Sequence, residues 1–178
     1  MKKILLFSIV LFLVTDLYSQ VEVAQMFSHK GRSYGLGYGA FLKVAYPISE
    51  GDDVSLELGA RAFSEKGTGW VDGVLACPLK LGYRYTLDRS GEGFYIEPQL
   101  GYNVYGVESY YDDTAYKTVN VKFHGIVAAA GVGYLFRPSR HQVDLGLHIE
   151  TVFYKQQSVT CISLRLTENI SFRKKEYY

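Results

Sequence analysis

The feature that most constrains this chain is a two-residue alternation that recurs along most of its length. Between Val54 and Ser64, one set of alternate residues is Val, Leu, Leu, Ala and Ala, and the intervening set is mostly Ser, Glu, Gly and Arg. Successive side chains of a β-strand point to opposite faces, so this segment has one apolar face and one polar face. Repeated over many strands behind an export signal, the pattern predicts a β-barrel in an outer membrane, with its apolar side towards lipid and its polar side towards the lumen.

Seven segments carry the alternation clearly, and an eighth carries it weakly. The clear segments are 34–47, 54–64, 71–86, 94–106, 120–136, 142–154 and 159–172. The weak one is 21–28, which we accept as the first strand because single-chain bacterial barrels have an even number of strands. The expected fold class is therefore all-β, an eight-stranded antiparallel up-and-down transmembrane β-barrel.

The connections between these strands fall into two groups, one for each end of the barrel. Short periplasmic turns are expected at 49–53, 87–93 and 137–141, and external loops at 29–32, 65–69, 107–118 and 155–158. The longest connection, 107–118, falls on the external side, as this class of barrel prefers. Its tyrosines Tyr110, Tyr111 and Tyr116 make it a candidate contact surface for a protein partner, because Tyr suits interfaces.

The apolar set has aromatic residues near the strand ends and aliphatic residues between them, as expected for a surface that crosses a membrane. Aromatics expected at the periplasmic interface are Tyr46, Tyr83, Tyr85, Phe94, Tyr134, Phe136 and Phe172. Those expected at the external interface are Tyr34, Trp70, Tyr102, Phe123 and Phe153. This girdle favours a membrane barrel over a soluble one.

The opposite set combines glycines with charges of both signs, and we expect it to fill the lumen. An eight-stranded barrel is just wide enough inside for side chains to fill it. Buried charges are costly unless they pair, so the sequence predicts a packed network of ion pairs across the lumen. Its candidate members are Lys43, Glu57, Arg61, Lys80, Arg84, Glu97, Asp144, His148, Glu150 and Arg165.

The first residues have the pattern of a secretory signal peptide. Lys2 and Lys3 precede an apolar run from Ile4 to Val14 that is too short to span a bilayer as a helix. We expect residues 1–19 to be a cleaved signal peptide and residues 20–178 to be the barrel domain. Without the first 19 residues, positive and negative residues balance at 17 each, so no basic face for nucleic acid is expected. The predicted location is the outer membrane of a Gram-negative bacterium.

Several stretches resemble a known group of proteins. They are Tyr18-Ser19-Gln20 at the end of the signal, residues 77–85 (CPLKLGYRY), residues 94–102 (FYIEPQLGY) and residues 131–136 (GVGYLF). These resemble the small outer-membrane β-barrel proteins of the OmpA/OmpX-like kind, especially the PorT-like branch often called porin-family proteins. The resemblance implies insertion by the barrel-assembly machinery, which reads a strand-terminal aromatic. Either Phe172 or Tyr178 could supply that signal.

Residue patterns for catalysis or metal binding are weak. His148 and Glu150 share the lumen face of one strand, which would suit a base oriented by a carboxylate, but neighbouring charges are expected in the lumen anyway. His29, His124, His141 and His148 are scattered without ligand spacing. We therefore expect no enzyme activity, no cofactor and no metal site.

Asp113-Thr114-Ala115 in the longest loop resembles the acceptor motif of a bacterial O-glycosylation system, which makes Thr114 a candidate modification site. For function, the sequence favours a monomeric structural or interaction barrel in contact with outer-membrane lipid and lipopolysaccharide. A narrow pore for water or ions remains an alternative. So does a soluble lipocalin-like barrel that binds a hydrophobic ligand, since alternation alone does not tell inside from outside.

Overall fold

The described part of the chain forms nine antiparallel β-strands, which build a closed barrel with a projecting hairpin. The computed structural model describes residues 16–28, 34–65, 73–88, 92–112, 114, 116–136, 142–155 and 157–170. The strands are β1 (Asp16–Ser28), β2 (Leu36–Ser49), β3 (Asp52–Ser64), β4 (Gly73–Thr86), β5 (Gly93–Asp112), β6 (Lys117–Lys122), β7 (Gly125–Phe136), β8 (Val143–Tyr154) and β9 (Gln157–Ile170). Among these residues, no helix is long and apolar enough to cross a bilayer.

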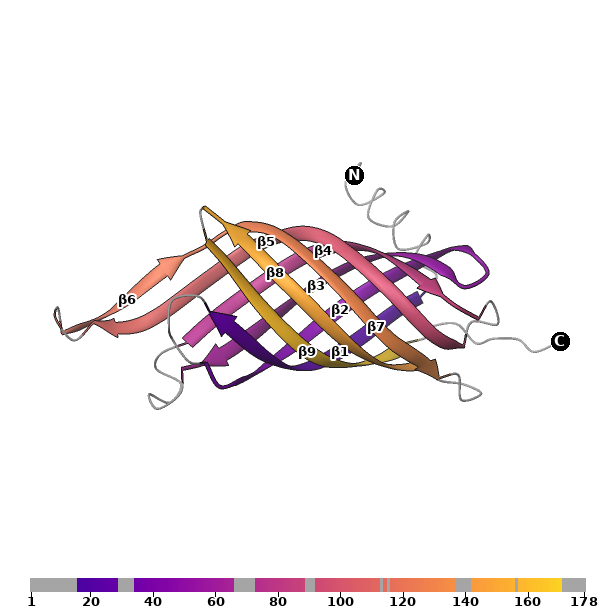
Figure 1. Cartoon of the computed structure of the whole chain (residues 1–178), viewed down its shortest axis with the longest axis horizontal. Coiled ribbons are helices and arrows are strands. Elements are labelled where there is room, and N and C mark those ends of the chain that lie inside the picture. The colour runs from indigo at the N-terminus through magenta and orange to yellow at the C-terminus, as the bar shows by residue number, and fades with distance from the viewer. Residues whose placement is uncertain are drawn as a thin grey trace, which may run out of the picture.

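The strand order closes the sheet on itself with eight strand positions. Neighbours follow the order β4-β3-β2-β1-β9-β8-β7-β5, and β4 also pairs with β5 (Figure 1). β6 pairs with β5 and continues the path of β7 beyond the barrel, so it adds no ninth position to the ring. The predicted eight-stranded antiparallel fold is confirmed.

The weakly predicted first strand is present and is longer than the alternation suggested. β1 begins at Asp16 and pairs with both β2 and β9, which closes the barrel between the first and last strands. Residues 16–19 therefore lie in β1, although they belong to the expected signal peptide. Residues 1–15 lie outside the described part of the chain, and the cleavage site stays a prediction.

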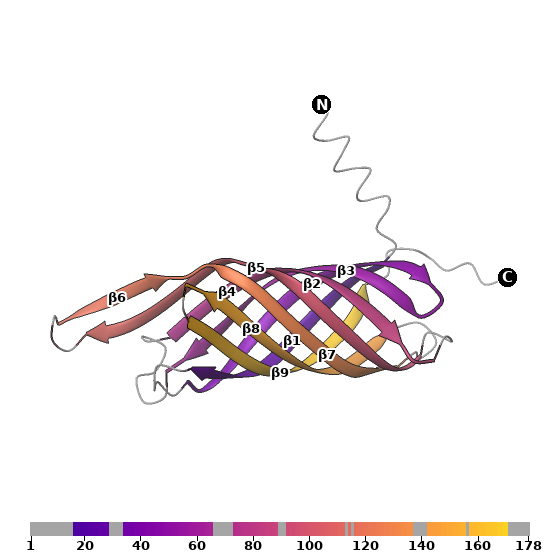
Figure 2. The same cartoon turned by 45° about the horizontal axis from the view of Figure 1, so that its top comes forward.

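The prediction of a loop at residues 107–118 is wrong, because most of this segment forms a β-hairpin. β5 continues to Asp112, and β6 pairs with it from Val107↔Lys122 to Asp112↔Lys117. This hairpin projects well past the other strand ends (Figures 1 and 2). We call this end of the barrel the hairpin end. The opposite end, where β1 begins and β9 ends, we call the terminal end.

A β-bulge in β5 explains why the sequence suggested a strand end near residue 106. Cys77 pairs with Tyr105 and Pro78 with Asn103, so Val104 is an extra residue on β5. Val104 and Tyr105 both face outward, and the alternation is reversed beyond them. The bulge therefore turns Glu108 towards the inside and hides the continuity of the strand from a simple two-residue pattern.

The apolar set of side chains faces outward, as predicted. Its exposed aliphatic members include Leu42, Leu56, Leu58, Leu79, Leu81, Ile126, Val132, Leu145, Leu147, Ile149, Ile162, Leu164 and Leu166. Aromatics surround the terminal end on the same face, namely Tyr46, Tyr83, Tyr85, Phe94, Tyr134 and Phe136. A lipocalin-like barrel needs the opposite arrangement, with its apolar face inside.

At the hairpin end, two of the predicted outward aromatics point inward instead. Tyr34 precedes β2, forms an isolated bridge with Glu65 and is only 3% exposed. Phe123 is 7% exposed and points inward, on the same side of the chain as Gly125 and Val127. Tyr102 and Phe153 face outward as expected. Trp70 and Phe172 lie outside the described residues, as does Tyr178.

Candidate functional site

The lumen is filled by side chains in three successive layers. A layer of mostly apolar residues lies at the hairpin end, a cycle of six charges lies in the middle, and a chain of four charges lies at the terminal end. All ten charged or titratable residues expected in the lumen are buried. The structure thus buries all ten of these side chains inside the barrel.

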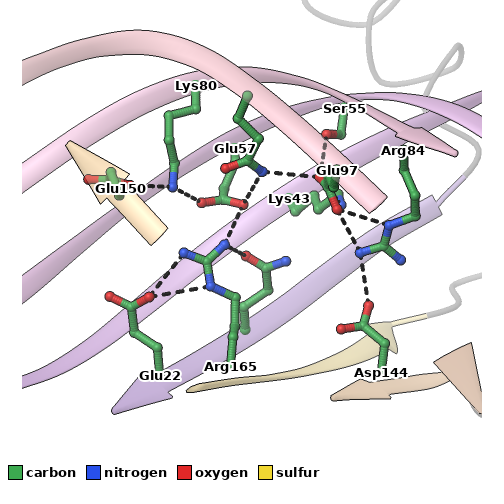
Figure 3. Close-up of polar contacts among 12 residues, drawn as sticks. Glu22, Lys43, Ser55, Glu57, Lys80, Arg84, Glu97, Asp144, Glu150 and Arg165 are labelled. Carbon is green, nitrogen blue, oxygen red and sulfur yellow. Dashed lines mark hydrogen bonds and ion pairs between the residues drawn. The ribbon is translucent and has the colours of Figure 1, made fainter. Parts of the chain in front are cut away.

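The middle layer is a closed cycle in which positive and negative side chains alternate, and we call it the six-charge ring. It runs in order through Glu22, Arg61, Glu150, Lys80, Glu57 and Arg165, with nitrogen–oxygen distances of 3.2, 2.7, 2.8, 2.8, 2.9 and 3.0 Å. Figure 3 shows Arg165 between Glu22 and Glu57, and Lys80 between Glu57 and Glu150. Each charge has two partners of opposite sign, which offsets the cost of its burial.

The six-charge ring crosses the barrel rather than following its wall. Arg61 is on β3 and Glu150 is on β8, and these strands lie opposite each other in the ring of eight. Arg61 also donates a hydrogen bond to the Sγ atom of Cys161 on β9. The contacts therefore fasten distant strands to one another across the lumen.

Phe41 on β2 lies among the three cations of the six-charge ring. The charged groups of Arg61, Lys80 and Arg165 lie 5.3, 5.2 and 4.7 Å from the centre of its ring. Cations over an aromatic face are attracted by its quadrupole, most strongly where water is excluded. Phe41 is 3% exposed, so it helps to hold three like charges close together without solvent.

The layer at the terminal end is a chain of four alternating charges. Glu97 accepts from Lys43 and lies 2.9 Å from Arg84, which in turn lies 3.0 Å from Asp144. The guanidinium of Arg84 stacks 4.0 Å from the centre of the Tyr95 ring. The Tyr95 hydroxyl donates to Asp144 over 3.1 Å, so the chain is braced at its end.

Gln99 links the two charged layers. Its Nε2 donates to Glu57 of the six-charge ring over 3.2 Å and to Glu97 of the chain over 3.1 Å. Ser55 adds a further hydrogen bond to Glu97, drawn at the top of Figure 3. The polar lumen is therefore one continuous network with equal numbers of Lys or Arg and of Asp or Glu in each charged layer.

The layer at the hairpin end is apolar, which the sequence interpretation missed. Its buried members are Ala24, Met26, Tyr34, Phe63, Val74, Ala76, Phe123, Val127, Val152 and Cys161. Glu108 enters this layer beyond the β5 bulge, and the Tyr34 hydroxyl donates to it over 2.8 Å. The cavity beside Glu108 has a volume of about 10 Å³, room for a single water molecule. The layer leaves little space for passage through the lumen.

Sequence analysis also missed three important residues of the polar network. Glu22 was overlooked because its strand showed only weak alternation. Phe41 and Tyr95 are aromatic, so their residue type alone does not mark them as members of a charged network. The signal that could have found them is parity, since Glu22, Phe41 and Tyr95 all fall on the lumen side of their strands.

His148 and Glu150 do not form the base-and-carboxylate pair considered from the sequence. Glu150 is held by Arg61 and Lys80, whereas Nδ1 of His148 has no hydrogen-bond partner among the described residues. Within the same part of the chain, no three His, Cys, Asp or Glu side chains are grouped as a metal site would require. His29 and His141 lie outside the described residues.

The hairpin is the second feature of interest, and it carries exposed tyrosines. Tyr111 is 46% exposed and Tyr116 is 82% exposed. Tyr116 also has a φ of 50°, a left-handed value that is uncommon for a bulky side chain. Thr114 lies in the hairpin turn and is exposed, while its neighbours Asp113 and Ala115 lie outside the described residues.

Comparison with solved structures identifies barrels of the same fold. Neisserial surface protein A has a TM-score of 0.67 and 11% identity, over 88% of this chain and 96% of that one. Ail, the attachment invasion locus protein of Yersinia pestis, has a TM-score of 0.61 and 11% identity, over 87% and 97%. The N-terminal β-barrel domain of Pseudomonas aeruginosa OprF has a TM-score of 0.59 and 13% identity, over 88% and 98%. No protein-family model and no curated protein matches the sequence.

Proposed function

We propose that this chain is a non-conducting barrel of a Gram-negative outer membrane that displays the β5–β6 hairpin at the cell surface as a contact surface. The observation that carries the proposal is the contrast between the two parts of β5, one inside the barrel and one beyond its rim. β5 contributes Glu97 and Gln99 to a filled lumen and then continues past the rim as a hairpin. The barrel would thus be an anchor, and the hairpin the part that meets other molecules.

The membrane location is supported by the outer face. Exposed aliphatic side chains surround the barrel between aromatic residues, which suits lipid and lipopolysaccharide rather than water. The fold is that of barrels whose names place them at bacterial surfaces or in attachment, including Ail. We expect a monomer, inserted by the barrel-assembly machinery after removal of the signal peptide.

The orientation is supported by the lengths of the connections. In barrels of this class, periplasmic turns are short and external connections are longer. β2 and β3 are joined at the terminal end by a tight turn, with Ser49 already paired with Asp52. The hairpin is at the other end, which we therefore assign to the outside.

A contact role is supported by the tip of the hairpin. Tyr116 adopts a strained backbone conformation, and its side chain is 82% exposed. Neither burial nor backbone preference therefore accounts for a tyrosine at this position. Tyrosine provides a large contact area with little loss of side-chain freedom. We also propose that the barrel has no enzyme activity, because the charged groups of the lumen form ion pairs with one another.

The first test is heat-modifiability and topology in the native membrane. The expressed protein should remain in alkali-washed outer membranes and change its mobility on SDS gels after boiling. In a variant without Cys77 and Cys161, Tyr116→Cys should react with an impermeant maleimide on intact cells, and the matched variant Glu50→Cys should not. Release by alkali, or labelling of Glu50→Cys alone, would refute the proposal.

The second test separates an anchor from a narrow pore. The purified barrel should show no conductance steps in a planar bilayer at neutral pH, because the apolar layer and the six-charge ring fill the lumen. Reproducible steps from the native protein, absent from protein-free controls, would favour the pore instead.

A further inference from the structure

The β5–β6 hairpin has a strand edge that no described strand covers. β6 pairs with β5 through six residue pairs and is the last strand in the sheet order. Figure 2 shows β6 beyond the closed part of the barrel. Residues along an antiparallel strand direct their backbone N–H and C=O groups alternately to the two sides, so half of the β6 backbone faces away from β5. An exposed edge of this kind is a template for another extended chain.

The side chains of β6 make this edge selective. The strand begins with Lys117 and ends with Lys122, and between them lie Thr, Val, Asn and Val, with no acidic residue. Both lysines are exposed. Thr and Val suit an extended backbone. The edge is therefore regular enough to pair and carries a lysine at each end. Asp112 of β5 lies directly opposite Lys117, whereas Val107 lies opposite Lys122, so Lys122 is the lysine with no acidic residue facing it on β5.

The same charges disfavour a second copy of this hairpin as the partner. If two β6 edges paired antiparallel about their centres, Lys117 of one copy would lie opposite Lys122 of the other, at both ends. Parallel pairing in register would place each lysine opposite itself. Like charges directly opposite each other destabilise a strand pair. Lysines on an edge strand protect against self-association in this way and leave the edge open to a segment of opposite charge.

We infer that β6 binds an extended acidic polypeptide segment by antiparallel strand addition. In such a pairing, partner residues keep the spacing of the residues they face, so acidic residues five positions apart in the segment lie opposite Lys117 and Lys122. The inference rests on the proposed display of the hairpin and adds the chemical class of its partner. Backbone hydrogen bonds supply the pairing, and the two lysines select the sequence.

The probe for this test is a synthetic peptide, acetyl-Gly-Glu-Val-Thr-Val-Thr-Glu-Gly-amide, whose two Glu residues are five positions apart. Residues 20–178, folded in lipid nanodiscs, would be titrated with it at about 150 mM salt while the backbone amides are followed by NMR. The expected result is saturable shifts in Lys117–Lys122 and slower hydrogen exchange of alternate β6 amides.

Two altered peptides test whether the backbone edge is used. Each carries N-methyl groups on alternate amides, one on the odd positions and one on the even positions. An added strand uses the amides of only one of its edges, so one methylated peptide should lose binding and the other should keep it. Equal binding by both peptides would overturn strand addition.

A charge reversal tests selectivity. The double variant Lys117→Gln, Lys122→Glu, which places no Glu opposite Asp112 of β5, should bind the acidic peptide about tenfold more weakly. It should bind a peptide with Lys in place of the Glu that faces residue 122. Lys155→Glu is the control, because it replaces an exposed lysine by glutamate in the β8–β9 connection, which is also at the hairpin end. It should alter the affinity for the peptide by less than about twofold. An equal effect of Lys155→Glu would show unspecific attraction and would overturn the inference.

The outcomes also separate this inference from the proposed function. If Tyr116→Cys is labelled on cells but the peptide does not bind, strand addition is wrong and the display function stands. If sucrose octasulfate binds with the same dependence on Lys117 and Lys122 while the peptide does not, the partner is an anionic sugar and the inference fails. If Tyr116→Cys is not reached from outside, the proposed function itself fails.

Discussion

Gly59 on β3 lies directly opposite Phe41 on β2, and the Phe41 ring occupies the space that a Cβ atom at Gly59 would take. The missing side chain lets Phe41 lie across the lumen, where it meets Arg61, Lys80 and Arg165. A glycine on the wall and a phenylalanine in the centre are therefore one structural unit. Together they position the cations of the six-charge ring.

Gly59→Ala should lower the free energy of unfolding by about 1–3 kcal/mol, because the new methyl group must displace Phe41 in a packed interior. The measurement is urea unfolding in lipid vesicles, followed by the loss of the fast-migrating folded band on SDS gels. Gly35→Ala is the matched control, since a Cβ there meets only Ser64 at ordinary contact distance. Equal losses in both variants would contradict the role given to Phe41.

Glu57→Gln should cost about 3–5 kcal/mol of unfolding free energy, because it leaves Lys80 and Arg165 without one of their two partners in a buried site. The same unfolding measurement applies. Glu50→Gln, in the exposed turn between β2 and β3, should change stability by less than about 0.5 kcal/mol.

Arg165→Gln in the Glu57→Gln background tests whether the two residues act together. The double variant should lose less than the sum of the two single losses, since each single change already breaks the shared pair. Strict additivity would mean that the ring closure contributes nothing beyond separate contacts.

Removing the hairpin should leave the barrel intact. Replacing residues 110–119 by Asn-Gly would join the paired residues Ser109 and Asn120 through a two-residue turn. The free energy of unfolding should change by less than about 1 kcal/mol, because Glu108 and the lumen layers remain in place. Loss of the heat-modifiable band would show that the hairpin is needed for the barrel to fold.

Thr114 is expected to carry an O-linked glycan in the native host, because the turn exposes it and Asp113 and Ala115 flank it as in the acceptor motif. Intact-protein mass spectrometry should show extra mass on the native protein that Thr114→Ala lacks. Thr118→Ala, on β6 of the same hairpin, is the control and should keep the extra mass. Masses that differ only by the substitution would refute the modification.

Much of the lumen could be assigned from the sequence because burial in a barrel follows parity. Each strand has only two faces, so a residue such as Lys80 or Arg165 that falls on the Gly-rich side must point inward. Parity does not work where a strand is irregular. The extra residue at Val104 reversed the alternation of β5, which made the continuing strand look like a loop and concealed the inward position of Glu108.

By itself, the sequence determined the strands and their two faces, because two-residue periodicity acts locally and needs no knowledge of which strands meet. The aromatic residues near the strand ends then indicated that the apolar face lies outside and the charged face inside. Only the tertiary structure decided which charges pair. Arg61 and Glu150 are 89 positions apart and meet because β3 and β8 lie opposite each other. It also decided that residues 107–118 form a hairpin with an open edge, since the path of β5 beyond the rim depends on a bulge and on pairing with β6.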